Sequence, residues 1–245
     1  MKKKLVTGAL LCAFGAVAVT GGTLAYFTDT DAKTNTFTTG NVAIELIENF
    51  GDNNPNTPEK LLPATGSAQA GTLENEVIKE VTVKNTGSEN AYVRVHIAIP
   101  SILDDGADTF NAGNNKLHFN YDPASVVDGK WNWSASKDTA TGTNWNFYTT
   151  NIDEKAYNVY VVTYETALEA GATTPEKAMT QVYLDNKTTN EDIAAYNEAL
   201  GANWQIKVVA EAAQEAGFDD AYTALNTAFG EPGKYTIDWS GAVNQ

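Results

Sequence analysis

The sequence predicts an all-β protein, an antiparallel β-sandwich with a few short helices inserted between the strands. Apolar and polar residues alternate in several short segments, and most of these segments are rich in aromatic and β-branched residues. Turn residues separate the segments at intervals of roughly 10–20 residues, as in sandwich proteins. The hydrophobic fraction of 42% and the five tryptophans indicate a folded core and argue against general disorder.

The clearest predicted strand covers residues 92–99 and ends at Pro100. One face is wholly apolar, whereas the other carries Tyr92, Arg94, His96 and Ala98. A strand over residues 77–84 precedes it, and the short turn segment between the two predicts a hairpin. Residues 51–72 are rich in Gly, Pro and Asn and indicate a loop. Further strands are expected over residues 42–47, 117–121, 131–133, 145–147, 157–164, 203–211 and 235–239.

Helical signals are few and local. Thr174 followed by Pro175 predicts a helix over residues 176–184. Asn190 is expected to cap a second helix over residues 191–200, which Gly201 ends. Together these two helices would form a helical insertion at about residues 174–201. A third short helix is expected over residues 219–229, before Gly230 and Pro232.

Residues 1–25 have the three parts of a cleavable export signal. Three lysines come first, an apolar run of roughly 16 residues follows, and small residues then place a cut between Ala25 and Tyr26. The apolar run is shorter than the ~20 residues that span a membrane, so cleavage is favoured over an uncleaved anchor. We therefore expect a secreted protein that meets the membrane only during export.

Cleavage also changes the charge and the chemistry of the chain. It removes three lysines and the single cysteine, Cys12, which leaves 13 basic and 31 acidic residues and a net charge of −18. Such a surface repels nucleic acid and anionic lipid, so neither is expected as a partner. A chain without cysteine forms no disulfide and has no thiol nucleophile or thiolate metal site.

No specific catalytic or metal-binding pattern is found, so no catalytic residue, metal ligand or cofactor is assigned. The two histidines, His96 and His118, lie outside any zinc-ligand spacing and are expected on the surface. A pairing of both with a carboxylate across two strands stays open. Residues 104–108 resemble part of a calcium loop but lack the closing glutamate, which favours an acidic surface turn.

Sugar recognition is one possible function. Tryptophans at 131, 133 and 145 could stack on sugar rings, although packing in the core or at a strand edge is the favoured use. Asn132 and Asn186 begin glycosylation sequons, a pattern that is common by chance. A monomeric, surface-bound glycan-binding module therefore remains an alternative.

One segment is specific. Residues 23–46, TLAYFTDTDAKTNTFTTGNVAIEL, closely resemble the start of the TasA/camelysin family of exported bacterial proteins. The resemblance continues in VKNTG at 83–87 and AYVRV at 91–95, and IKVVAEAAQ at 206–214 is similar to the last core strand of the family. The middle of the chain, about 101–203, is covered only loosely.

The resemblance implies a jelly-roll sandwich over residues 41–245 and a signal cut by a dedicated signal peptidase. It also implies a biofilm matrix protein that self-associates into fibres, with other matrix or cell-wall components as possible further partners. In such fibres the mature N-terminus, here residues 26–40, adds as a donor strand to the next subunit. The strand-forming residues would be Tyr26, Phe27, Thr28, Thr34, Thr36 and Phe37.

The same family also implies an alternative function, that of a camelysin-type cell-surface metalloendopeptidase. The chain gives this alternative little support, because it contains no recognisable zinc motif.

Overall fold

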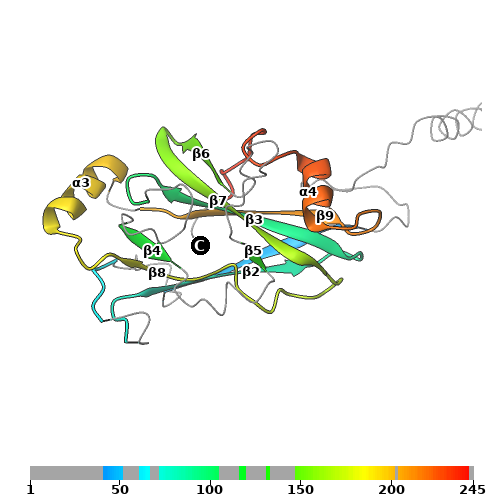
Figure 1. Cartoon of the computed structure of the whole chain (residues 1–245), viewed down its shortest axis with the longest axis horizontal. Helices are drawn as coiled ribbons and strands as arrows, with labels where there is room; N and C mark the ends of the chain where they lie inside the picture. Colours follow the sequence, from blue (N-terminus) through cyan, green and yellow to red (C-terminus); the bar gives the residue numbers. More distant parts are fainter. Residues whose placement is uncertain are drawn as a thin grey trace, which may run out of the picture.

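The computed structural model describes residues 41–51, 61–66, 72–104, 116–119, 131–132, 147–201 and 204–242. Within these residues the chain forms two antiparallel sheets, which lie one above the other as two layers (Figure 1). Two helices accompany the sheets in this part of the chain. The predicted all-β sandwich with a few short helices is therefore confirmed. The predicted export signal and donor segment, residues 1–40, lie outside the described residues.

The first sheet has the strand order β1-β2-β8-β4. Its strands are β1 (Ile44–Phe50), β2 (Val77–Asn85), β8 (Met179–Leu184) and β4 (Leu117–Phe119). All neighbours in this sheet are antiparallel.

The second sheet has the order β5-β7-β3-β9, and β6 also pairs with β7. Its strands are β5 (Trp131–Asn132), β6 (Phe147–Ile152), β7 (Lys155–Leu168), β3 (Ala91–Pro100) and β9 (Lys207–Gln214). The chain changes sheet after β2, β3, β4, β7 and β8, which are connections of the kind that jelly rolls contain.

The main core lies between the two sheets. Strand β3 stands at its centre, and all ten of its residues are buried. Its inward face contributes Val93, Val95, Ile97 and Ile99, which are completely inaccessible. Its outward face is covered by helix α4 (Ala221–Phe229), which lies across the outer surface of this sheet (Figure 1). Helix α3 (Asn190–Leu200) lies at one end of the sandwich instead.

The predicted hairpin between the strands at 77–84 and 92–99 is wrong. Strand β2 pairs with β1 and β8, whereas β3 pairs with β7 and β9 in the other sheet. The connection between them therefore crosses from one layer to the other. Both strands are buried on their inward faces, and each finds its hydrogen-bond partners among strands distant in sequence.

The predicted helix over residues 176–184 is also wrong, because residues 179–184 form strand β8. Thr174 does not cap a helix: its Oγ1 accepts a hydrogen bond from the Val83 amide at 3.1 Å. Its own amide donates to the Val83 carbonyl, so the chain already runs beside β2 at this point. Met179, Val182 and Leu184 then enter the core. The predicted helical insertion at 174–201 is thus reduced to α3.

The other two helices are confirmed. Helix α3 begins one residue earlier than predicted, with Thr189 as its N-cap, and Gly201 follows its end. Helix α4 has Asp220 as its N-cap and Gly230 at its C-terminal end. Neither described helix is long and apolar enough to cross a membrane. The strand predicted over residues 235–239 is absent from the structure, where these residues are irregular.

Candidate functional site

The chain enters the sandwich beside the connection between β2 and β3. The amide of Asn41 donates to Oγ of Ser88 at 2.9 Å, and the Ser88 amide donates back to the Asn41 carbonyl at 2.9 Å. The amides of Thr86 and Gly87 both donate to the carbonyl of Ala43, at 2.8 and 3.0 Å. These bonds form a clip on residues 41–43, and we call this end of the sandwich the entry end.

The VKNTG segment supplies part of this clip, and two of its residues, Asn85 and Gly87, hold the clip in shape. Asn85 is completely buried, and its Nδ2 donates to the carbonyls of Glu89 and Leu168 at 2.8 and 2.9 Å. Its Oδ1 accepts from the Gly87 amide at 2.9 Å. A Cβ on Gly87 would lie 2.2 Å from the Asn41 carbonyl oxygen, so only glycine fits there. The segment therefore fixes the place where the N-terminal segment leaves the domain.

Within the described residues, two strands have an unpaired edge on one side of the sandwich. Among the described strands, β1 pairs only with β2, and β9 pairs only with β3. Strands β1 and β9 are also in contact with each other across the two layers. Each edge presents backbone N–H and C=O groups that a further extended segment could satisfy.

A small cavity lies at the end of the sandwich opposite the clip, which we call the pocket end. The cavity has a volume of about 50 Å³ and a largely apolar lining. Phe50, the last residue of β1, forms one wall, and Trp204 and Ile206, just before β9, form another. Buried Leu103 and Leu117 contribute to the lining as well. The cavity therefore lies between the end of β1 and the beginning of β9.

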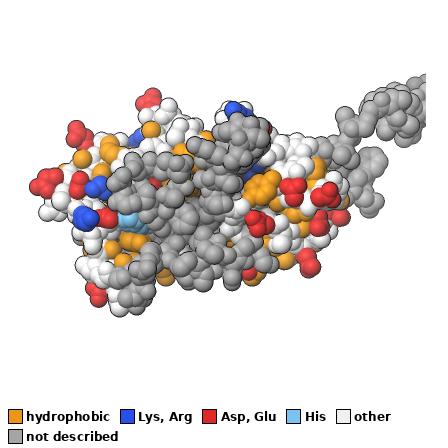
Figure 2. Space-filling view, viewed as in Figure 1, with side chains coloured by type: hydrophobic (Ala, Val, Ile, Leu, Met, Phe, Trp, Pro, Cys, Tyr) orange, Lys and Arg blue, Asp and Glu red, His pale blue; other side chains and the backbone are white. Residues whose placement is uncertain are grey.

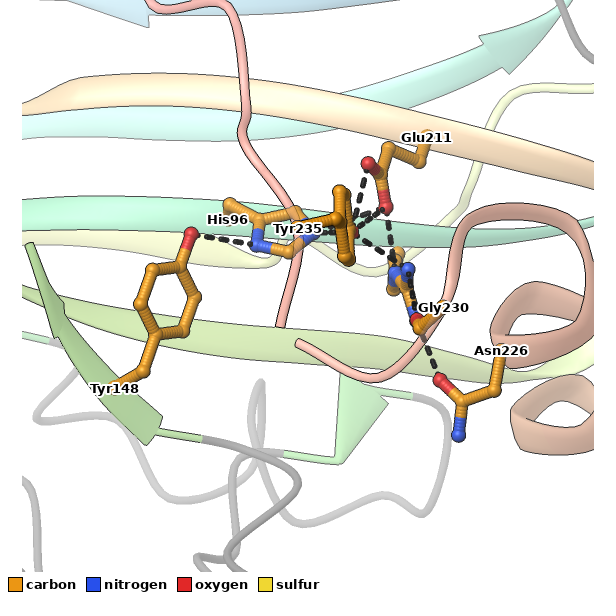
Figure 3. Close-up of polar contacts among 7 residues, drawn as sticks. His96, Tyr148, Glu211, Asn226, Gly230 and Tyr235 are labelled. Carbon is orange, nitrogen blue, oxygen red and sulfur yellow. Dashed lines mark hydrogen bonds and ion pairs between the residues drawn. The ribbon is translucent and has the colours of Figure 1, made fainter. Parts of the chain in front are cut away.

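The outward face of the second sheet carries a buried polar cluster (Figure 3). Arg94 of β3 lies opposite Glu211 of β9, and its Nε donates to Glu211 Oε2 at 2.6 Å. The side chains of Arg94 and Glu211 are only 2% and 9% exposed. The two strands that supply them correspond to two of the segments that resemble the TasA/camelysin family.

The remaining donors of Arg94 attach the C-terminal part of the chain to the sheet. Its guanidinium donates to Asn226 Oδ1 at 2.8 Å, to the Gly230 carbonyl at 3.2 Å and to Tyr235 Oη at 2.7 Å (Figure 3). Tyr235 Oη in turn donates to the Glu211 carboxylate. One arginine thus holds the end of α4 and the following irregular segment against β3 and β9.

His96 extends the cluster toward β6. Its Nε2 lies 3.0 Å from Glu211 Oε2, and its Nδ1 lies 3.3 Å from Tyr148 Oη. Burial lowers the pKa of His96, so the ring is neutral at pH 7. A neutral ring that donates from Nε2 to Glu211 and accepts at Nδ1 from Tyr148 satisfies both contacts.

Glu211 is the anionic centre of the cluster. Burial works to raise the pKa of its carboxyl group, but the hydrogen bond from His96 and the positive charge of Arg94 outweigh burial and lower the pKa to about 2. Glu211 is therefore ionised at neutral pH.

The expectation that both histidines lie on the surface is wrong for His96, which is 0% exposed. The reason is the cover that α4 and the irregular C-terminal segment lay over this face. His118 is partly buried, stacks on Tyr183 and has its Nε2 3.0 Å from Asp185 Oδ2. The two histidines lie in different sheets and have different carboxylate partners, so they do not form one pair. No group of three or more metal-ligating side chains occurs within the described residues.

Two further residues that the sequence singled out, Trp131 for sugar stacking and Asp104 for a calcium loop, are buried in the fold. Trp131 is 2% exposed, tilts against Tyr164 and donates from Nε1 to the Glu176 carbonyl, so its ring packs in the core. Asp104 is buried and accepts hydrogen bonds from Asn158 and Tyr160, which places it inside the fold and not on a surface turn. Trp133, Trp145 and residues 105–108 lie outside the described residues.

The chain was compared with known protein families. Residues 1–54 match the model of the camelysin metallo-endopeptidase family. The match confirms the resemblance that the N-terminal segment indicates. No curated protein matches the chain. Of the camelysin-matched stretch, the structure describes residues 41–51, which are the clip and β1. The predicted cleavage residues Ala25 and Tyr26 lie in the remainder, as do Phe27, Thr28, Thr34, Thr36 and Phe37.

Sequence reasoning did not find the pairing of Arg94 with Glu211. A signal for it was present: Arg94 and Glu211 each stand among apolar or small neighbours in the interior of their strand, and their charges are opposite. A lone charge in such a strand needs a buried partner when both faces are covered. The cover by the C-terminal segment was the missing information, because it alone makes this face an interior one.

Proposed function

We propose that the mature protein is a secreted structural subunit of an extracellular matrix fibre, in which residues 26–40 of one copy add as a strand to the next copy. One observation carries the proposal: an N-terminal segment that matches the camelysin family model precedes the clip, and β1 and β9 each have an edge that pairs with no other described strand. The segment and the edges are complementary parts of one interaction.

The composition of the segment suits strand addition. Threonine has a high β propensity, and Tyr26, Phe27 and Phe37 provide large apolar contacts. Fully extended, its fifteen residues reach about 50 Å at roughly 3.3 Å per residue, more than enough to bridge two domains. Backbone hydrogen bonds to a free edge would provide affinity, and the aromatic side chains would fix the register.

The charge distribution supports a specific contact over general adhesion. Acidic side chains outnumber basic ones on the visible face of the domain (Figure 2). Copies with a mature net charge of −18 repel one another, so random association is disfavoured. A strand added through backbone hydrogen bonds and apolar anchors overcomes this repulsion only where the geometry fits.

The test compares two purified proteins, residues 26–245 and residues 41–245, at equal concentration. We expect filaments from the longer protein and monomers from the shorter one, seen by negative-stain electron microscopy and light scattering. Circular dichroism and urea unfolding establish that both are folded, which is expected because the main core runs from Val42 onward in the described chain. Identical filaments from the shorter protein would refute donor-strand assembly.

The matched family is described as metallo-endopeptidases, which makes zinc-dependent proteolysis the second candidate. Both ring nitrogens of His96 already have hydrogen-bond partners inside the fold. Of the two histidines, the partly exposed His118 is therefore the better candidate for a zinc ligand. The protease reading predicts casein cleavage that requires zinc, stops with a chelator and is lost in His118→Ala or His96→Ala. Absence of cleavage by folded, zinc-supplemented protein would eliminate it.

A further inference from the structure

The cavity at the pocket end penetrates into the main core. Leu103, Leu117 and Val182 form its floor and are almost completely buried. Phe50 and Trp204 at its rim are only partly buried and pack against the same core. An apolar side chain that fills such a cavity from outside stabilises the resulting complex, because apolar surface is removed from water.

Among the described residues that line the cavity, Lys79 is the one with a charge, and this charge is already compensated. Lys79 is 1% exposed, forms an ion pair with Glu48 and lies with its Nζ 5.2 Å from the centre of the Phe50 ring. An apolar ring that enters the cavity therefore leaves no ammonium group without a partner. The chemistry of the cavity suits an uncharged aromatic or aliphatic side chain.

We propose that this cavity receives the ring of Phe37 from the N-terminal segment of a second copy, so that copies join entry end to pocket end. The inference rests on the proposed fibre function and deepens it by naming the contact that fixes the polarity of assembly.

Distance selects a second copy over the same chain. Phe37 precedes Asn41 by four residues, so it reaches at most about 13 Å from the clip at roughly 3.3 Å per residue. The cavity of the same copy lies beyond the ten-residue strand β3, a distance of about 33 Å at the same rise. The ring of Phe37 therefore cannot reach its own cavity, whereas the cavity of a copy docked against the entry end is within range.

The spacing of the aromatic residues also fits Phe37 in the cavity. Ten residue steps separate Phe27 from Phe37, which spans about 33 Å when extended and equals the length of β3. With Phe37 in the cavity, the preceding residues lie along the free edges of β1 and β9, and Phe27 arrives at the entry end of the acceptor. The cavity is smaller than the ~150 Å³ that encloses a whole benzene, so the ring enters by its edge and rests against Phe50 and Trp204.

Cysteine cross-linking tests this contact directly, since the mature chain has no cysteine of its own. A protein of residues 26–245 with Phe37→Cys is mixed, above its raised critical concentration, with one carrying Gln205→Cys, which lines the cavity, and oxidised during assembly. The control partner carries Ser240→Cys in the exposed segment beyond α4. We expect at least roughly tenfold more mixed disulfide with Gln205→Cys than with Ser240→Cys, because assembly raises the local concentration of the pair.

A second measurement does not depend on disulfide chemistry. Phe37→Ala is expected to raise the critical concentration for filaments by roughly 10–100-fold, the factor that corresponds to burial of one large apolar side chain. Phe37→Leu should raise it less, and Thr36→Ala should leave it nearly unchanged. Because residue 37 lies before the described core, these variants are expected to stay folded.

The outcomes separate the two proposals. If filaments form but the Gln205→Cys partner cross-links no better than the control, or Phe37→Ala assembles normally, the cavity is not the acceptor and the fibre function stands. If residues 26–245 form no filaments at all, the fibre function itself is refuted. A disulfide within one dilute copy of a Phe37→Cys/Gln205→Cys double variant would show that the segment folds back, which contradicts the proposal.

Discussion

Arg94 and Glu211 face each other across the adjacent strands β3 and β9, and the Nε of Arg94 donates to Glu211 Oε2 at 2.6 Å. Both side chains are enclosed by the sheet on one side and by α4 with its following segment on the other. The pair therefore joins the central strand β3 to the edge strand β9 and at the same time attaches the C-terminal part of the chain. Removal of either charge should disturb both connections.

The first prediction concerns Glu211→Gln. This change leaves the guanidinium of Arg94 buried without its counter-ion, which we expect to cost about 3–5 kcal/mol of unfolding free energy. Urea unfolding followed by tryptophan fluorescence measures the loss. The matched control is Lys177→Met, which breaks an ion pair with Glu80 whose side chains are 40% and 28% exposed. The control should lose less than about 1 kcal/mol, because solvent screens an exposed pair.

A double variant, Arg94→Met with Glu211→Met, tests the cause of that loss. When both charges are removed together, no charge is left buried alone, so the double variant should be less destabilised than the sum of the two single variants. Additive losses would show that the cost comes from lost packing and not from the buried unpaired charge.

The second prediction is a loss of stability in acid. The folded pKa of Glu211, about 2, lies below its ordinary value of 4.5, so the unfolded chain takes up the proton first. The stabilisation is complete above pH 4.5 and disappears as the pH falls from about 4.5 to about 2. The folded pKa of His96 is also lowered, so stability begins to decrease below about pH 6.5.

Urea midpoints measured from pH 3 to pH 8 follow this decrease. In Glu211→Gln the part below pH 4.5 should become shallower, while exposed carboxylates continue to titrate in both proteins. An equal slope in the two proteins would assign the acid sensitivity to other carboxylates.

The third prediction concerns Tyr235, whose hydroxyl lies between Arg94 and Glu211. Burial raises its pKa well above the ordinary value of 10.0, and Glu211 adds to the rise against the opposing effect of Arg94. The unfolded chain therefore loses the proton first, and stability declines as the pH rises above 10. Tyr235→Phe should lose about 1.5–3 kcal/mol at pH 7 with the hydrogen bond to the carboxylate. It should also decline less steeply than the parent between pH 10 and 11, as measured by urea midpoints.

The sequence predicts the parts of the fold that depend on neighbouring residues better than the parts that depend on strand pairing between distant residues. Alternation located β2 and β3 well, because polar and apolar side chains alternate along each strand within a few residues. The sequence did not predict that β2 and β3 belong to different sheets, since a short connection can join two strands of a hairpin or two strands in different layers. The same limit explains β8, where the Thr174–Pro175 signal favoured a helix but pairing with β2 and β4 decided for a strand.

The sequence predicted only part of the candidate site. The N-terminal segment and the VKNTG segment were identified as specific, yet the sequence did not show that Asn85 and Gly87 form the clip on residues 41–43. That function depends on backbone atoms brought together by the fold. His96 was misplaced on the surface for a related reason: the segment that covers it begins more than a hundred residues later in the chain.

The last prediction concerns Gly87, which connects the fold to assembly. In Gly87→Ala the new Cβ would lie 2.2 Å from the Asn41 carbonyl oxygen and 2.7 Å from the Ala43 nitrogen, so residues 41–43 must move away. We expect a loss of about 1–3 kcal/mol of unfolding free energy from this clash. Hydrogen exchange of the Thr86 and Gly87 amides, which donate to Ala43 in the parent, should become faster, while the amides of β3 stay protected.

Gly241→Ala is the matched control, because nothing lies within 4 Å of an added Cβ there. It should leave stability, amide exchange and filament formation unchanged. If residues 26–40 are the donor segment, Gly87→Ala should still fold but form filaments more slowly or with irregular shape, because the segment no longer leaves the domain in a fixed direction. Normal filaments from a protein whose clip has opened would mean that the clip serves only the stability of the domain, since a connection that sets the direction of assembly cannot be lost without effect on the filament.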